Sequence, residues 1–259
     1  MIFFMIPTTW LQSRKFKNLT ITERVFLLWL LKMYNDNQMH KLPGEPKHAF
    51  YTADDVIAAT LNITPMTVKN ARKTLKKNRY IKTKPGGIYA TEEGRKYRAT
   101  IYYLDPYRDF LKELKNKRGN YTTYSKYTFE ALLRNGISHK GILLHFYLRR
   151  LEALNNKGDY GKIKIATKYN FFKVLSSQSG MHFQSIKKAF EELTNLKFSS
   201  GDSWVSLKTQ SLSYIIEIKY PADPRDNEDN KQSRNEWLNS IYKKAEQERE
   251  KRKQMPMVI

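Results

Sequence analysis

Residues 52–90 read TADDVIAATLNITPMTVKNARKTLKKNRYIKTKPGGIYA, a stretch with two short helical patterns followed by a basic hairpin pattern. Thr52 stands before two acidic residues, which favour the first turn of a helix, and its hydroxyl can cap that helix. Farther on, Thr64-Pro65 places a capping hydroxyl before a proline at the first helical position. We therefore expect one helix from about Thr52 to Thr60 and another that begins at Thr64.

The second of these helices is expected to have an apolar face and a basic face. Val68, Ala71 and Leu75 recur at helical spacing and predict the side that packs on the other helices. Between Met66 and Lys82 the chain has seven basic residues and no acidic one. Like charges at this density repel one another, so phosphates that neutralise them explain the pattern best. A solvated helix face, which normally mixes both signs, is the alternative interpretation.

A hairpin is expected directly after the basic helix. Residues 79–84 and 88–90 look like short strands, and Pro85-Gly86-Gly87 has the composition of the turn between them. Two short helices with a tight turn, followed by a basic hairpin, are the layout of a winged helix. In that fold the second helix enters the DNA major groove and the hairpin is the wing.

The apolar pattern of this stretch recurs farther along the chain. Residues 52–82 align with residues 167–197 without a gap at an offset of 115 (167 − 52), and residues 26–28 match residues 142–144 at an offset of 116 (142 − 26). Identity is low, but the apolar segments recur in the same order, which predicts a duplicated domain. In the second copy we expect helices over 138–154, 167–175 and 179–193, a hairpin around Gly201-Asp202, and a further strand over 212–220.

The expected fold class is α+β, mainly helical, with two tandem winged-helix domains and a C-terminal helix. The expected boundaries are 1–104 for the first domain, 105–120 for a charged connecting helix, 121–220 for the second domain, and 221–259 for a polar linker and the charged C-terminal helix. An apolar stripe on that last helix needs a surface to cover it, and we expect this surface to be the second domain or, alternatively, a partner protein. The stripe consists of Trp237, Leu238, Ile241, Tyr242 and Ala245.

The outward face of the basic helix supplies the candidate DNA-reading side chains. Asn70 can bond adenine through two hydrogen bonds, Lys73 can reach guanine, and Thr67 can touch a thymine methyl group. Each of them can instead bind a phosphate. Backbone contacts are expected from Lys69, Lys76 and Lys77 on the helix, and Lys82 and Lys84 on the wing would hold the backbone or enter a minor groove. Arg72 is expected nearer the buried side of the helix.

The second copy has less charge on the corresponding helix. At the 115-residue offset, His182, Ser185 and Lys188 occupy the outward positions, and residues 181–197 carry three basic and two acidic side chains. This copy therefore either reads a second half-site with less attraction to phosphates or contributes its surface to protein contacts such as dimerisation.

The composition favours a polyanionic partner and gives no sign of catalysis. The formal net charge is +22, from 47 Lys and Arg against 25 Asp and Glu. Nucleic acid is the commonest partner of such a chain, and an acidic membrane surface is the main competitor. There is no cysteine, no phosphate-binding loop and no tight histidine spacing, so we expect no metal, no cofactor and no catalytic residues. The lack of a membrane span and of cysteine is compatible with the cytoplasm.

The tandem pattern resembles plasmid and phage replication initiators that carry two winged helices. A strand like Phe4-Met5-Ile6-Pro7, a phrase like that of residues 19–24 and a helix-turn-helix like that of residues 52–80 are similar to the N-terminal domain of initiators from low-GC Gram-positive plasmids. The resemblance covers about residues 4 to 220. It implies binding of double-stranded DNA at repeated origin sites, homodimerisation, and recruitment of a helicase or helicase loader, with the C-terminal helix as the expected contact surface.

Two other functions remain open at the level of the sequence. A transcriptional regulator of a mobile element would use the same DNA-binding surfaces. A structural or adaptor protein would use the winged helices for protein contacts and its charge for RNA or a membrane surface.

Overall fold

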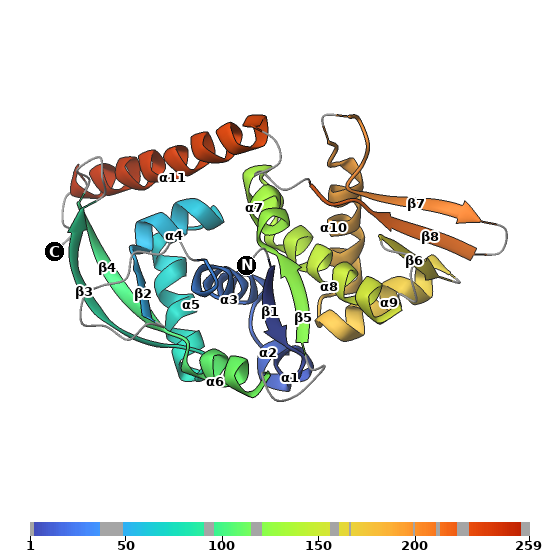
Figure 1. The fold of residues 1–259 in the computed structure, drawn as a ribbon, viewed down its shortest axis with the longest axis horizontal. Helices are drawn as coiled ribbons and strands as arrows, with labels where there is room; N and C mark the ends of the chain where they lie inside the picture. The colour runs from blue at the N-terminus through green and yellow to red at the C-terminus, as the bar shows by residue number, and fades with distance from the viewer. Residues whose placement is uncertain are drawn as a thin grey trace. The chain divides into compact units, whose positions relative to one another are not determined.

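The computed structural model describes residues 3–36, 49–90, 96–114, 121–155, 161–165, 167–198, 200–210, 213–221 and 228–254 (Figure 1). Within those residues the chain forms eleven helices and three small antiparallel sheets, an α+β fold that is mainly helical. In the part of the chain that the structure describes, no helix is both long and apolar enough to span a bilayer.

The chain divides into two compact units that are each discontinuous in sequence. Unit 1 combines residues 1–28 with 119–222, and unit 2 combines residues 29–118 with 223–259. This division differs from the sequential boundaries expected above. The difference arises because β1 (Phe3–Pro7) pairs with β5 (Tyr121–Ser125), so the N-terminal strand belongs with the second half of the chain.

Unit 2 holds the helix pair and the three-stranded sheet of the first copy. After α3 (Ile21–Tyr34), which contains the unit boundary, its elements are β2 (Ala49–Thr52), α4 (Asp54–Leu61), α5 (Pro65–Lys77), β3 (Lys82–Ala90), β4 (Lys96–Tyr103), α6 (Asp105–Leu114) and α11 (Glu228–Gln254). The three strands form one sheet in the order β2-β4-β3. The expected connecting helix is thus α6, while residues 115–120 and most of the expected polar linker lie outside the described residues.

Unit 1 holds the second copy and the N-terminal elements. In addition to β1 and β5 it contains α1 (Thr8–Gln12), α2 (Arg14–Lys17), α7 (Lys126–Arg134), α8 (His139–Asn155), β6 (Lys162–Ile165), α9 (Lys168–Ser179), α10 (Phe183–Asn195), β7 (Val205–Gln210) and β8 (Ser213–Ile218).

The internal repeat is confirmed by the order of these elements. The first copy opens with β1, the two short helices α1 and α2, and the long helix α3, and the second opens with β5, the nine-residue helix α7 and the long helix α8. Each is followed by a strand, two helices and an antiparallel strand pair. The sheet orders also correspond, because β6-β8-β7 repeats β2-β4-β3.

The register between the two copies differs from the expected one in the last helix. α5 and α10 both have thirteen residues and lie 118 residues apart (183 − 65), not 115. The extra residues are in α9, which is twelve residues long where α4 has eight, so the turn expected at 176–178 is part of that helix. A slip of three residues keeps an apolar stripe on nearly the same helix face, so the apolar pattern alone could not detect it.

The expected hairpin turn is wrong in the first copy, whereas the turn expected at Gly201-Asp202 is present in the second copy. Gly86 and Gly87 lie inside β3, where the register with β4 shifts, and the strand continues to Ala90, which pairs with Lys96 of β4. A Cβ at Gly86 would come within 3.0 Å of the carbonyl oxygen of Ala99, so the glycine allows a close approach of two strands instead of a turn. At Gly201, whose φ is 83°, the chain turns: the Phe198 amide donates to the Asp202 carbonyl, the Trp204 amide donates to the Leu196 carbonyl, and Lys197 forms an antiparallel bridge with Ser203. The strands β7 and β8 then form a second antiparallel pair.

Thr20 and Thr64 cap helices, whereas Thr52 does not. Thr20 and Glu23 form a reciprocal capping box at the start of α3, and Thr64 caps α5 by accepting a hydrogen bond from the Thr67 amide. Thr52, by contrast, lies in β2 and does not cap α4, whose N-cap is Ala53.

The C-terminal helix packs on the first copy, so the expectation that it covers the second domain is wrong. Ile241 and Ala245 are buried against Ala53 and Val56, and α11 lies beside α4 in unit 2 (Figure 1). The apolar stripe of α11 therefore covers α4, the helix that directly precedes the basic helix α5.

His145 of α8 is a core residue, at an apolar face of that helix. Its ring is fully buried, Nδ1 lies 2.8 Å from the Tyr124 hydroxyl, and the rings of Trp204 and Tyr220 stand edge-on to it. Burial, assisted by the nearby Arg149 charge, lowers the pKa of His145 to about 3.

We predict that this histidine makes unit 1 less stable in mild acid. Because the folded-state pKa of His145 lies below its unfolded value near 6.5, its contribution is complete above pH 6.5 and is lost as the pH falls toward 3. The loss is about 1.4 kcal/mol per pH unit, or about 2 kcal/mol between pH 6.5 and 5. Urea unfolding at the two pH values measures it. His145→Gln, which keeps a hydrogen-bonding group but does not titrate, should lack that part of the pH dependence, and an unchanged dependence in the variant contradicts the prediction.

Candidate nucleic-acid interface

Helix α5 is positioned by strong local signals at its start. Asn62 ends α4 in a left-handed conformation with φ 52°, which Asn tolerates better than most residues, and the chain turns directly into the Thr64 cap and Pro65. Val68, Ala71 and Leu75 are buried and fix the helix on its neighbours. The opposite face is thereby held in one orientation toward solvent.

That opposite face carries a row of exposed lysines. Lys69, Lys73, Lys76 and Lys77 are all exposed, and none of them forms an ion pair with any other residue that the structure describes. Asn70 is exposed beside them. The structure therefore brings five of the expected contacts onto one surface of a single rigid helix.

Thr67 is less available than expected. Its side chain is half-buried, and its hydroxyl lies 2.9 Å from the Thr64 hydroxyl within the N-terminal cap of α5. Its position at the end of the exposed face still allows a methyl contact, but the hydroxyl has a local partner.

Arg72 points toward the core, in agreement with the expectation that it lies near the buried side of α5. Its guanidinium bonds Asp54 of α4 and lies 3.3 Å from both the Thr100 and Tyr102 hydroxyls of β4. Burial disfavours the charged guanidinium, but the hydrogen bond that it donates to Asp54 and the contact with Tyr102 hold the pKa of Arg72 above its ordinary value. This arginine ties α5 to α4 and the sheet.

The two expected wing lysines lie on β3. Lys82 is 76% exposed but forms an ion pair of 3.0 Å with Asp105 at the start of α6. An exposed pair of this kind is worth about 0–1 kcal/mol, so a phosphate can compete for the lysine. Lys84 is exposed, and its Nζ lies 5.8 Å from the centre of the Tyr103 ring.

The second copy presents a different surface. His182 is the N-cap of α10 and accepts a hydrogen bond from the Gln184 amide, so it corresponds to Thr64 and not to an outward position. At the 118-residue offset, Ser185 corresponds to Thr67 and Lys188 to Asn70, while the position of Lys73 is taken by Glu191. Ser185 is half-buried, whereas Lys188 and Glu191 are exposed and give this face mixed charge.

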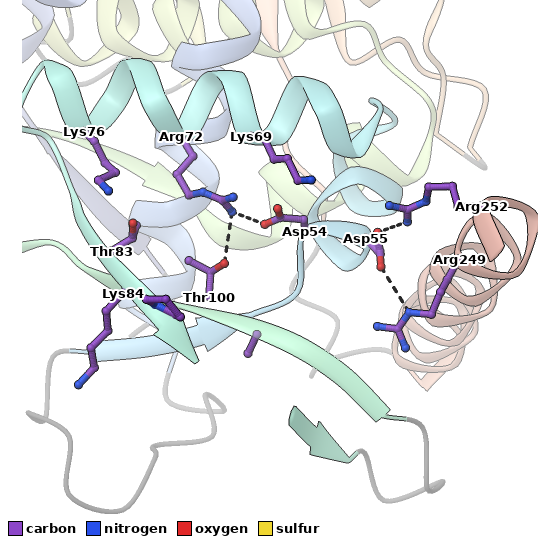
Figure 2. Close-up of a pocket in the computed structure, with 12 residues that line it drawn as sticks. Asp54, Asp55, Lys69, Arg72, Lys76, Thr83, Lys84, Thr100, Arg249 and Arg252 are labelled. Atoms are coloured by element: carbon purple, nitrogen blue, oxygen red, sulfur yellow. Dashed lines mark hydrogen bonds and ion pairs between the residues drawn. The ribbon is translucent and has the colours of Figure 1, made fainter. Parts of the chain in front are cut away.

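Two arginines of the C-terminal helix, which no sequence pattern connected with this site, lie beside the basic helix. Arg249 and Arg252 of α11 both pair with Asp55 in the first turn of α4, next to a pocket that α5 and the strands also line (Figure 2). Their sequence separation from Asp55 is almost 200 residues, and no local pattern connects the two segments. Only the packing of the α11 stripe on α4 brings them together.

Comparisons of the chain with protein-family models, with curated proteins and with solved structures found no match.

Proposed function

We propose that the chain is a sequence-specific double-stranded-DNA-binding protein with two tandem winged helices, and that it initiates replication of a plasmid or phage. The observation that carries the proposal is the row of exposed lysines on α5, which have no acidic partner among the described residues. A surface that concentrates one sign of charge on a rigid helix fits a polyanion.

The elements around α5 suit the winged-helix interpretation. α4 and α5 are joined by a tight turn, and the strand pair β3–β4 follows α5 directly. In this arrangement α5 would lie in the major groove, with Asn70 toward base edges and the lysines toward phosphates. Lys82 and Lys84 on β3 would hold the backbone alongside.

The duplication favours a protein that binds two similar DNA segments. An initiator that recognises repeated origin sites would use α5 as its main contact and α10 as a weaker one, because Glu191 replaces a lysine there. The alternative is a transcriptional regulator of a mobile element, which would use the same helices on a promoter. An adaptor that binds only proteins would leave the lysine row of α5 without a role.

Footprinting on the DNA that flanks the gene distinguishes these functions. We expect the full-length protein to protect several AT-rich direct repeats spaced by about whole helical turns. Protection of a single palindrome over a promoter would replace the initiator with a regulator. An absence of any protected site on the flanking DNA, with no binding to other duplexes, would exclude both.

A further inference from the structure

The C-terminal helix brings basic side chains to the surface that the proposed function assigns to DNA. Its middle is anchored by Ile241 and Ala245, which pack on Ala53 and Val56. From there its last turns pass the N-terminal end of α4, where Arg249 and Arg252 meet Asp55. Because the apolar cluster holds the helix, the arginines are not needed as its main anchor.

Basic side chains outnumber acidic ones at this place. Asp55 has a side chain that is only 13% exposed and pairs with two arginines, while Asp54 already pairs with Arg72. Each of the two acids therefore has at least one arginine partner. Nearby, Lys69 and Lys76 make no ion pair with other described residues.

These groups surround a pocket between α5, the strands β3 and β4, and α11, which we name the α11 pocket. Among the described residues its basic lining is Lys69, Arg72, Lys76, Lys84, Arg249 and Arg252, against the two acids Asp54 and Asp55. Figure 2 shows Lys69, Arg72 and Lys76 on the side of α5 that faces the strands, with the two arginines at one end. A hollow with an excess of one charge attracts and holds ions of the other sign.

The chemistry of the lining fits a phosphate group. Arginine and lysine bind phosphate oxygens, and the Thr83 hydroxyl on β3 can donate a neutral hydrogen bond to the same group. The pocket opens between the helix that would enter the major groove and the strand pair that would lie along the backbone. A backbone phosphate of the bound duplex is therefore the anion that this position would meet.

We propose that the α11 pocket binds a phosphate of the DNA backbone, so that the C-terminal helix is part of the DNA-binding surface of the first copy. This inference rests on the proposed function. It assigns a role to Arg249 and Arg252 that the sequence pattern did not suggest, and it makes Asp55 a competitor of the phosphate for the two arginines.

The test compares variants of opposite expected effect in the full-length protein. Arg249→Ala/Arg252→Ala should weaken binding to a duplex by about tenfold and lower the slope of log affinity against log salt by about 1. Asp55→Asn, which releases both arginines, should strengthen binding several-fold. The matched control is Lys243→Ala/Lys244→Ala, which removes two exposed charges from the same helix outside the pocket and should leave the slope nearly unchanged.

Several outcomes would overturn the inference without touching the proposed function. If the wild type binds DNA and the arginine variant binds it with the same affinity and salt slope as the lysine control, the pocket is excluded as a DNA contact. If both Asp55→Asn and the arginine variant weaken DNA binding and lower the urea midpoint, the ion pairs between Asp55 and the two arginines only stabilise the packing of α11. Binding of inorganic phosphate at fixed ionic strength, with DNA affinity unaffected by the variants, would assign the pocket to a free anion. No DNA binding by the wild type would instead remove the proposed function itself.

Discussion

We expect the replacement of Lys69, Lys73 and Lys76 together by alanine to lower the affinity of the protein for duplex DNA by roughly 10²–10³-fold at about 0.1 M salt. Each lysine that neutralises a phosphate releases about 0.9 of a counterion, and at that salt concentration this release raises the binding constant by nearly a factor of ten. All three side chains are exposed on α5 and make no ion pair with other described residues, so their removal leaves no buried charge behind. Fluorescence anisotropy of a labelled duplex measures the change.

The matched control removes the same charge from other exposed positions. Lys140→Ala/Lys243→Ala/Lys244→Ala takes away three exposed lysines that lie outside α5, and we expect it to weaken binding by less than about a factor of five. Surface changes of either kind should shift the free energy of unfolding by no more than about 0.5 kcal/mol each. Equal losses of affinity in the two triple variants would mean that only net charge matters and that α5 is not the contact surface.

The second large effect concerns the stability of unit 1. Glu152 on α8 is almost fully buried, accepts a hydrogen bond of 2.7 Å from the Gly161 amide, and pairs with Arg149 at 2.7 Å. It also accepts a hydrogen bond from the Tyr220 hydroxyl just after β8. Glu152→Ala removes the acceptor from all three donors and leaves a partly buried guanidinium without its partner. We predict a loss of about 3–5 kcal/mol in the free energy of unfolding.

Urea or thermal unfolding tests this prediction with two further variants. Glu152→Gln keeps acceptor capacity but not the charge, so its loss should be smaller than that of the alanine variant. Glu191→Ala changes an exposed carboxylate of the same unit and should stay within about 0.5 kcal/mol of the wild type. A loss below about 1 kcal/mol for Glu152→Ala would show that the buried cluster does not hold this part of the unit together.

The start and the face of α5 could be predicted from sequence because they depend on neighbours within one or two helical turns. Thr64 and Pro65 specify where the helix begins, and the apolar spacing of residues 68–75 specifies its buried side. The lysines occupy the remaining positions of the helix, so the same spacing predicts that they are exposed. For the same reason the inward position of Arg72 was predicted correctly, although its partner Asp54 was not.

The misplaced features depend on contacts that local patterns do not contain. Gly86 has the composition of a turn, yet its role is set by the backbone of Ala99 on the neighbouring strand. His182 was assigned to the DNA-binding face because a three-residue slip preserves the apolar stripe, and only the length of α9 resolves the register. The packing of α11 on α4 joins segments almost 200 residues apart, so the α11 pocket could not be predicted from either segment alone.

The salt dependence of duplex binding is the most direct test of whether α5 contacts DNA. For the full-length protein we expect the affinity for a duplex with the protected repeats to fall by roughly 10²–10³-fold between about 50 and 200 mM salt. The Lys69/Lys73/Lys76 triple variant should show a log–log slope smaller by about 3. Binding that is absent or insensitive to salt, or a triple variant with the wild-type slope, would contradict the proposal that this helix is the DNA-binding surface.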